Sequence, residues 1–263
     1  MQLPRQIELD QVAVFDRKKY LQICKKEKMQ DVTVRLSFAS QILLGSRHIF
    51  FDALISHICL RAALGDDFYT LSSKIPFANA DQIIESKVPH PIKNMDGVMY
   101  SSVMEFYTSD GLVDPERDSK LITIYKRFDG LRSERIPTKK SKISVGSGLL
   151  RSYAMRIPAI VADHADVHVR CKPESLGLLL RHVTNIGKKY ALGFGQVRSI
   201  EILNPIKKGI VHDGIALRPI PIEMCKHYTD MEIIPYKVPY WSRDNMRQCV
   251  PPGGQCELRS NYE

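Results

Sequence analysis

The chain has 263 residues, 44% of them hydrophobic, and its 38 Lys and Arg exceed its 29 Asp and Glu to give a formal net charge of +9. The length allows one large domain or two modest ones. No apolar run reaches the roughly 18 residues of a membrane span, and the N-terminus lacks a signal peptide's apolar stretch. We therefore expect a cytoplasmic protein without membrane contact. The basic excess favours a polyanionic partner, although a mildly basic protein without one fits the charge equally well.

The cysteines are scattered and lie mostly in apolar or strand-like contexts, so we expect reduced, partly buried thiols. Structural zinc sites usually pair ligands two to four residues apart, and the Cys249 to Cys256 spacing does not fit that pattern. We predict no metal and no cofactor. The six residues are Cys24, Cys59, Cys171, Cys225, Cys249 and Cys256.

The first half of the chain contains patterns for one helix and several strands. Residues 1–30 are polar and lysine-rich, with a possible surface helix over 11–28. Apolar and polar residues alternate over 31–38, which predicts a half-buried strand. Residues 51–65 have helical spacing that ends at Gly65, so we expect a helix packed on a sheet. Residues 66–96 are irregular, and 98–107 and 121–128 are predicted strands.

Residues 129–158 form the most one-sided basic stretch, opposed only by Asp129 and Glu134. We expect a hairpin or loop excursion here. Its cationic and aromatic residues are Arg132, Arg135, Lys139, Lys140, Lys142, Arg151, Tyr153 and Arg156.

The second half adds a strand over 166–171, a helix that starts at 172–174 and is capped by Gly187, and a strand over 197–203. Prolines in 205–263 suggest short strands and extended segments. The order is strand, helix, strand, basic excursion, strand, helix, strand. It predicts an α+β fold: a ferredoxin-like or RNA-recognition βαββαβ domain over 31–204 with a β-hairpin insertion at about 129–158. Residues 1–30 would be an extension and 205–263 a mostly β C-terminal region.

The last helix and strand are joined by residues 187–195, which we name the glycine loop. Glycines permit positive φ and close approach of a ligand, lysines supply charge for phosphate, and aromatic rings can stack on bases. Rossmann and P-loop motifs place glycines between a strand and the following helix, whereas these follow a helix, so both motifs are excluded. A single glycine at a helix end is commonly structural. The loop contains Gly187, Lys188, Lys189, Tyr190, Gly193, Phe194 and Gly195.

A Gly-x-x-x-x-x-Gly-aromatic-Gly loop between a helix and the final strand of such a domain resembles the RAMP superfamily of CRISPR proteins. The segment 48–54, with Asp52-Ala53-Leu54, is similar to that superfamily's first helix. Further segments resemble the Cas-five-type subunit of type IV CRISPR systems, the Csf-three family, and the resemblance spans about residues 31–254. These segments are 147–155, 182–189, 217–221 with Arg-Pro-Ile-Pro, 239–241 with Pro-Tyr-Trp, and 249–252.

The resemblance implies a non-catalytic subunit that binds the five-prime handle of the crRNA and caps a filament of Cas-seven-type backbone subunits. It also implies a large or Cas-eight-like partner, contact with target DNA through the complex, and a role in defence against plasmids or phage. The basic stretch would be the thumb that wedges against RNA. The glycine loop would bring backbone N–H groups and its lysines to phosphates, while Tyr190 or Phe194 could stack a base.

Two alternatives remain. A related subunit in one CRISPR subtype cuts precursor RNA without metal, and His48, just before the first helix, could act as an acid or base near RNA. No Ser/His/Asp spacing or carboxylate cluster suggests a nuclease, so we expect no enzyme activity. The second alternative is an unrelated ferredoxin-like metabolic or regulatory domain, which would leave the basic stretch without a role.

Overall fold

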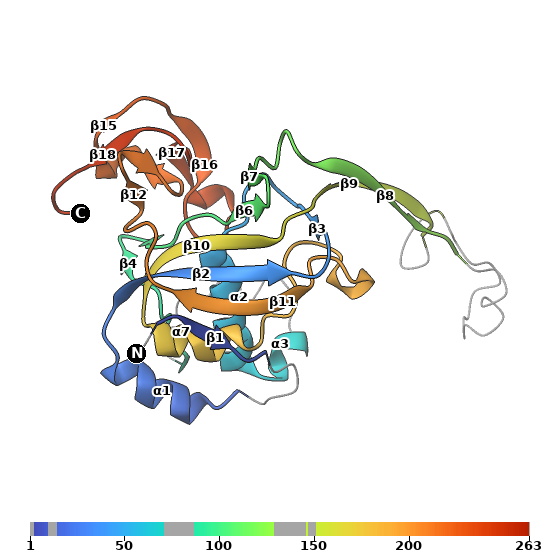
Figure 1. Ribbon diagram of the computed structural model, residues 1–263, viewed down its shortest axis with the longest axis horizontal. Helices are drawn as coiled ribbons and strands as arrows, with labels where there is room; N and C mark the ends of the chain where they lie inside the picture. Colours follow the sequence, from blue (N-terminus) through green and yellow to red (C-terminus); the bar gives the residue numbers. More distant parts are fainter. Residues whose placement is uncertain (1–2, 10–14, 71–86, 129–145, 147–150, 263) are drawn as a thin grey trace.

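The computed structural model describes residues 3–9, 15–70, 87–128, 146 and 151–262. Figure 1 shows a mixed fold with a central sheet and few helices, as the sequence predicts. The sheet has six strands in the order β1-β11-β2-β10-β6-β7, and every neighbouring pair is antiparallel. Its strands are β1 (Arg5–Ile7), β2 (Gln30–Phe38), β6 (Glu105–Thr108), β7 (Gly111–Val113), β10 (His164–Cys171) and β11 (Val197–Leu203).

Helices cover one face of this sheet because alternate strand residues point the same way. Val32, Val34 and Leu36 of β2 are fully buried in one core with Ile55 of α2 and Leu176 of α7. Figure 1 shows these helices behind and below the sheet. The described helices are α1 (Arg17–Lys26), α2 (Phe51–Leu64), α3 (Asp67–Thr70) and α7 (Pro173–Leu180). None of them is long and apolar enough to cross a membrane.

Along the chain, β2, α2, β6, β10, α7 and β11 follow one another in the predicted order of strands and helices. Within the sheet the four strands stand in the order β11-β2-β10-β6. The first residues add to this arrangement, since Arg5, Gln6 and Ile7 pair with β11. The N-terminal segment therefore supplies an edge strand.

Three predicted boundaries are wrong. The helix expected to reach Gly187 ends at Leu180, because the N–H groups of His182 and Val183 make tighter turn bonds to the Leu179 and Leu180 carbonyls. The strand expected over 98–107 splits into β5 (Val98–Met99) and β6, separated by isolated bridges at Ser101 and Val103.

The third wrong boundary concerns the basic excursion, which begins earlier than residue 129. Its arms are the paired strands β8 (Lys120–Lys126) and β9 (Tyr153–Ile160), which we call the hairpin, and β9 also pairs with β3 (Ile42–Leu43). The predicted strand at 121–128 therefore belongs to the hairpin, which projects from the body at the right of Figure 1. The predicted thumb residues Arg132, Arg135, Lys139, Lys140 and Lys142 lie outside the described residues.

The C-terminal region consists of short strands, as predicted, around a second core that includes Tyr100, Ile220 and Cys249. All six cysteines are buried and free. The strands of this region are β12 (Val211–His212), β13 (Ile215–Ala216), β14 (Ile220–Pro221), β15 (Cys225–Tyr228), β16 (Glu232–Pro235), β17 (Met246–Val250) and β18 (Cys256–Leu258), and its 3-10 turns are η2 (Ile222–Met224) and η3 (Arg243–Asn245). Two short strands from earlier in the chain, β4 (Asn94–Met95) and β5 (Val98–Met99), pair with each other and contribute to the second core. A third 3-10 turn, η1 (Tyr190–Leu192), lies in the glycine loop.

A buried polar cluster joins this region to α2. Arg218 is 1% exposed, and its guanidinium donates to the Tyr240 hydroxyl at 2.7 Å and to the Tyr236 carbonyl at 2.8 Å. The Tyr240 hydroxyl donates to the Asp52 carboxylate at 2.6 Å, and Arg218 lies 3.4 Å from the same oxygen. Asp-Ala-Leu, Arg-Pro-Ile-Pro and Pro-Tyr-Trp, three of the segments that carry the family resemblance, thus meet in one structural contact.

Candidate nucleic-acid interface

The glycine loop is fixed to the segment that leads into β3. The Lys188 N–H donates to the Leu43 carbonyl at 2.9 Å, and the Gly195 N–H donates to the Gln41 carbonyl at 2.8 Å. The Ser40 hydroxyl donates to the Gly193 carbonyl at 2.7 Å. Both ends of the loop and its middle are therefore held by the same neighbouring segment.

Two of the three glycines are required by close backbone contact. Gly187 and Gly195 have φ of 87° and 62°. A Cβ at Gly195 would lie 1.7 Å from the Ile186 carbonyl oxygen, and one at Gly187 would lie 2.5 Å from that of Leu43. Gly193 also has a positive φ, 85°, but a Cβ there would meet no atom within 4 Å. Gly187 and Gly195 therefore shape the loop.

Several backbone donors of the loop are already used inside the protein. Besides Lys188 and Gly195, the Leu192 N–H donates to the Lys189 carbonyl and the Gly193 N–H donates to the Tyr190 carbonyl, both at 2.9 Å. These four groups cannot also serve a phosphate without breaking an existing hydrogen bond. Phosphate contacts from this loop would therefore come mainly from side chains.

The two aromatic residues of the loop have different surroundings. Phe194 is half-buried and packs against the small core formed by Leu43, Ile157 and Ala159. Its ring thus joins the loop to the hairpin. Tyr190 is 69% exposed. Tyr190 is therefore the ring with a face available for a base.

The structure brings the glycine loop and the hairpin together at Tyr153. The Lys189 ammonium donates to the Tyr153 hydroxyl at 3.4 Å and lies 5.6 Å from the centre of its ring. The Lys126 ammonium lies 6.0 Å from the same ring. Arg151 is exposed two residues before Tyr153. Side chains predicted from two separate parts of the sequence thus form one basic and aromatic surface, which we call the loop–hairpin junction.

A groove of about 480 Å³ runs beside this junction. Its cations Arg47, Arg156 and Lys188 face one acidic residue, Glu116, whose carboxylate lies 3.4 Å from Arg47 at an exposed ion pair. Arg47 had no signal in the sequence beyond its place in a Gly-Ser-Arg turn between a strand and a helix. The groove offers an anionic chain a path along the base of the hairpin.

His48 lies near this region but has a different character. It is half-buried before α2, and its ring centre is 6.4 Å from that of Phe50. Burial, assisted by the nearby Arg47 charge, lowers the pKa of His48 to about 4. The imidazole is therefore neutral near pH 7, the form that can accept a proton as a general base but is a poor general acid.

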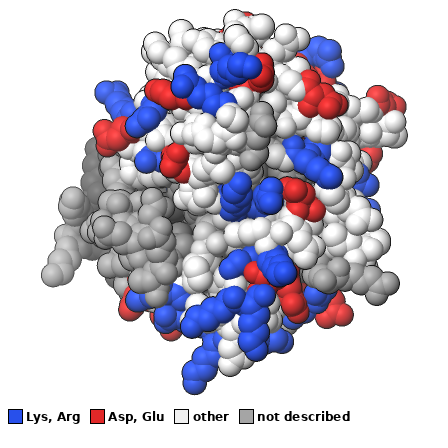
Figure 2. Space-filling view, turned by 90° about the vertical axis from the view of Figure 1, so that its left-hand side faces the viewer, with Lys and Arg blue, Asp and Glu red and all other residues white. Residues whose placement is uncertain are grey.

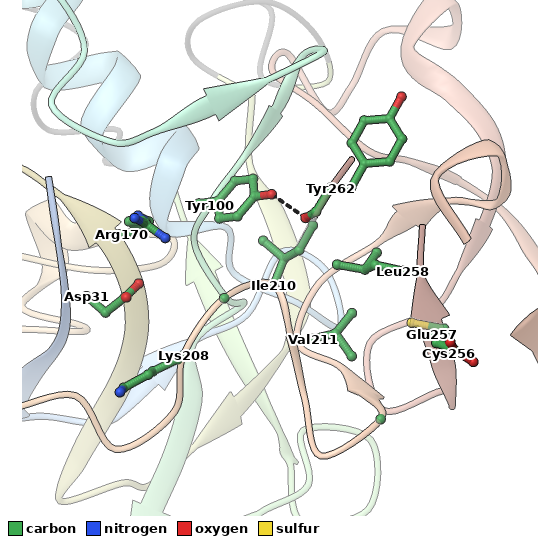
Figure 3. A pocket seen from close by; sticks show the side chains of 12 residues that line it. Asp31, Tyr100, Arg170, Lys208, Ile210, Val211, Cys256, Glu257, Leu258 and Tyr262 are labelled. Carbon is green, nitrogen blue, oxygen red and sulfur yellow. Dashed lines mark hydrogen bonds between the residues drawn. The ribbon is translucent and has the colours of Figure 1, made fainter. Parts of the chain in front are cut away.

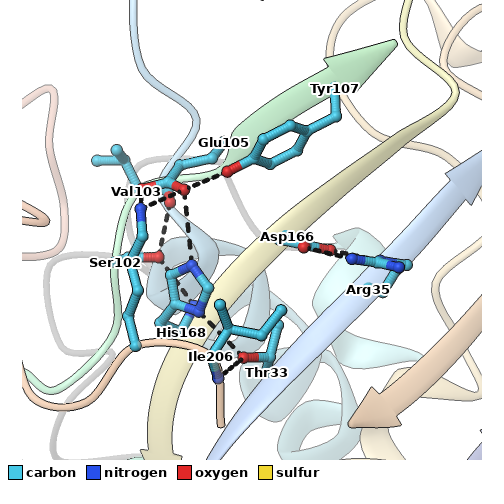
Figure 4. A network of polar contacts seen from close by, with 10 residues as sticks. Thr33, Arg35, Ser102, Val103, Glu105, Tyr107, Asp166, His168 and Ile206 are labelled. Atoms are coloured by element: carbon cyan, nitrogen blue, oxygen red, sulfur yellow. Dashed lines mark hydrogen bonds and ion pairs between the residues drawn. The ribbon is translucent and has the colours of Figure 1, made fainter. Parts of the chain in front are cut away.

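The second face of the central sheet holds a polar network that the sequence did not reveal (Figure 4). Lys207 donates to both carboxylate oxygens of Glu105 at 2.7 Å, and the Tyr107 hydroxyl donates to Glu105 at 2.8 Å. His168 Nε2 lies 3.5 Å from Glu105, which is long for a hydrogen bond, so we treat it as an electrostatic contact. The only trace of this network in the sequence is the alternation of polar residues along β2, β6 and β10.

On the same face Arg35 makes a two-pronged bond to Asp166, at 2.8 and 2.7 Å. The Thr33 hydroxyl lies 3.0 Å from His168 Nδ1 and accepts from the Ile206 N–H at 3.0 Å. The segment after β11 is thereby tied across the sheet. These side chains are occupied by internal contacts, and the exposed junction remains the stronger candidate for an external ligand.

Figure 2 shows the side of the molecule that carries α1 and the C-terminal region. Lys and Arg gather at its lower end, where α1 lies, and mix with Asp and Glu elsewhere. A run of this kind on one helix is usually a solvated face, so it serves as a comparison for the junction. The lysines of α1 are Lys18, Lys19, Lys25 and Lys26.

The family described as CRISPR type IV associated protein Csf3 matches residues 116–252, just over half of the chain. The matched range includes both arms of the hairpin, the glycine loop and Arg218. No curated protein matches. Among solved structures, the chain is similar to one titled "Cryo-EM structure of the Type III-B Cmr-beta bound to cognate target RNA". Identity is 12% and the TM-score 0.37, over 75% of this chain and 69% of that chain.

Proposed function

The chain belongs to the Csf3 family of type IV CRISPR associated proteins, and from this we propose that it is a non-catalytic, RNA-binding subunit of a type IV CRISPR ribonucleoprotein. In this role it binds the five-prime handle of the crRNA and caps a filament of Cas-seven-type backbone subunits. A large or Cas-eight-like subunit completes the complex, which meets target DNA in defence against plasmids or phage.

The proposed fold is a ferredoxin-like RAMP domain with a thumb. The strand order β11-β2-β10-β6, with α2 and α7 in the same core, supports the ferredoxin-like part. The hairpin lies between β7 and β10 in the chain, and this position supports its assignment as the thumb. The glycine loop then precedes the last strand of the domain.

The single observation that carries the proposal is the meeting of Lys189 with Tyr153. Single-stranded RNA is bound through phosphate contacts to cations and through bases stacked on aromatic rings. The junction supplies both, with Lys188 and Lys189 for phosphates and Tyr190 as an exposed ring. The loop below them is held by backbone hydrogen bonds, so little conformational entropy is lost when RNA binds.

Fluorescence anisotropy with repeat-derived single-stranded RNA tests the binding. We expect Lys188→Glu with Lys189→Glu to weaken binding and to flatten the dependence of log affinity on log salt. Each lost phosphate contact reduces that slope by roughly 0.7, so two contacts give about 1.4. The matched control is Lys25→Glu with Lys26→Glu, an adjacent exposed pair in the last turn of α1.

The two reversals change the net charge equally, so only a site at the junction separates them. An unchanged affinity and slope in the junction variant would overturn the proposal. An equal loss in both variants would mean that net charge, rather than the junction, controls binding.

The proposed absence of catalysis is tested with the same RNA. We expect it to stay intact during prolonged incubation with the protein in EDTA. A fixed cut within the repeat that disappears in His48→Ala would instead favour the metal-independent endoribonuclease.

A further inference from the structure

A second cavity, of about 500 Å³, lies on the second face of the central sheet, beside the C-terminal region (Figure 3). Asp31 at the start of β2 and Arg170 near the end of β10 are directly opposite each other and line it. The glycine loop is attached near the other end of β2, beyond Phe38. At about 3.3 Å per residue, the strand separates the two places by roughly 25 Å.

Three of the charged side chains at this cavity have no ion-pair partner in the described part of the chain. Among the described residues, no opposite charge lies within 4 Å of Asp31, Arg170 or Lys208. Glu257 also lines the cavity, but its carboxylate is 2.9 Å from Lys226. The polar network farther along the same face pairs its charges with one another, whereas Asp31, Arg170 and Lys208 line the cavity.

Lys93 adds a third cation beside the cavity. Its ammonium lies 4.1 Å from the centre of the Tyr100 ring. Partial desolvation and the charge of Arg170 lower the pKa of Lys93, and the nearby Asp31 carboxylate opposes that shift. Lys93 and Arg170 are thus near enough to repel each other, and Asp31 offsets part of this repulsion. A bound anion would relieve this repulsion.

The remaining walls are apolar and fixed. Val211, Leu258 and Tyr262 line the cavity together with Ile210, which is fully buried. The Tyr100 hydroxyl donates to the Tyr262 carbonyl at 2.7 Å, which holds the end of the chain in place as a wall. Figure 3 shows Arg170, Asp31 and Lys208 on one side and Val211, Leu258 and Tyr262 on the other.

We propose that this cavity binds a nucleotide, either free or as the end of a nucleic acid strand. The apolar wall suits a base, Arg170 and Lys208 suit the phosphate, and Asp31 can accept from ribose hydroxyls or a base amino group. The volume lies within the range of about 300 to 1,000 Å³ that small-molecule sites occupy. The site is separate from the loop–hairpin junction and does not rest on the function proposed above.

Isothermal titration of the full chain with AMP, GMP, CMP, UMP and inorganic phosphate tests the proposal. We expect saturable binding of at least one mononucleotide, tighter than that of phosphate. Because hydrogen bonds to charged groups are the strong ones, Arg170→Met and Lys208→Met should each weaken binding about tenfold. The control is Lys18→Met, an exposed cation of α1, which should bind as the wild type does.

Thermal unfolding of each variant shows whether it is folded, and Lys208, which is exposed after β11, keeps the test valid if Arg170→Met is unstable. A five-prime phosphorylated trinucleotide separates the two sources. If the trinucleotide binds more tightly than the mononucleotide, and Lys208→Met weakens that binding, the natural ligand is a strand end. If the mononucleotide binds and the trinucleotide does not bind more tightly, the natural ligand is a free nucleotide. The proposal is overturned if no mononucleotide binds at millimolar concentration, if phosphate binds as tightly, or if Lys208→Met and a folded Arg170→Met have no effect.

Discussion

The loop–hairpin junction and the polar network of the central sheet use charge in opposite ways. At the junction, backbone groups of the glycine loop are hydrogen-bonded within the protein, while Lys188 and the Tyr190 ring are exposed. In the network, charged side chains such as Glu105 and Asp166 have internal partners. Side chains fixed to each other stabilise the fold, whereas exposed side chains on a fixed backbone are available to a partner.

The largest effect that tests this difference is on the loop backbone. We expect Gly195→Ala to lower the free energy of unfolding by more than about 3 kcal/mol, because its Cβ would overlap the Ile186 carbonyl. In Gly193→Ala the added Cβ meets no other atom. This substitution should therefore lower the free energy of unfolding only through the strain of a left-handed alanine, by about 1 to 2 kcal/mol. Urea denaturation measures both. Equal costs would show that the loop is not fixed as described.

Glu105→Gln tests the network and should have an intermediate effect. Lys207 and Tyr107 donate to this carboxylate, whose side chain is 16% exposed. We expect a cost of about 1 to 3 kcal/mol in urea denaturation. The exposed pair Lys226–Glu257 provides the control, and Glu257→Gln should cost less than about 1 kcal/mol. Similar values for the two variants would mean that the network adds no stability.

The network also predicts a pH dependence. Burial alone would raise the pKa of Glu105, but contacts with His168, Lys207 and Tyr107 outweigh burial and lower it to about 2 from an ordinary 4.5. A lowered pKa stabilises the fold above about pH 4.5, and the stabilisation disappears as pH falls toward 2. The difference in unfolding free energy between wild type and Glu105→Gln should therefore shrink over that interval. A constant difference would contradict the ionised carboxylate.

The smallest effect on stability is expected at Tyr190. Because its ring is 69% exposed, Tyr190→Ala should change the free energy of unfolding by less than about 0.5 kcal/mol. Phe194→Ala should cost about 1 to 3 kcal/mol, since that ring packs on the hairpin core. RNA affinity should follow the reverse order, with about a tenfold loss for Tyr190→Ala. A larger RNA effect from Phe194 in a folded variant would reverse the roles.

Sequence patterns predicted the elements with strong local signals. The alternation over 31–38 and the helical spacing from Phe51 correspond to β2 and α2. The hairpin arms were misjudged because an exposed ribbon and a sheet strand share the same alternation, and only pairing with β9 distinguishes them. Gly187 follows a helical pattern, so the local sequence indicates a helix cap. The actual reason for this glycine is its close contact with Leu43, which lies more than 140 residues earlier and cannot be inferred from local sequence.

The candidate site could be predicted only in part, because some of its features depend on contacts between residues distant in sequence. The cations and aromatic residues of the glycine loop stand out locally, but nothing local separates Phe194 from Tyr190. Their different burial depends on Ile157 and Ala159 of β9. The roles of Arg47 and Lys207 could not be predicted, because their partners Glu116 and Glu105 are distant in sequence.

The cluster of Asp52, Arg218 and Tyr240 has a consequence for synthesis of the chain. Asp52 leaves the ribosome first, Arg218 follows 166 residues later, and Tyr240 follows 188 residues after Asp52. A nascent chain thus carries an uncompensated carboxylate at a position that becomes 1% exposed. Closure of the cluster is therefore a late step of co-translational folding, and a fragment that stops before Tyr240 retains Arg218 without its closest side-chain partner.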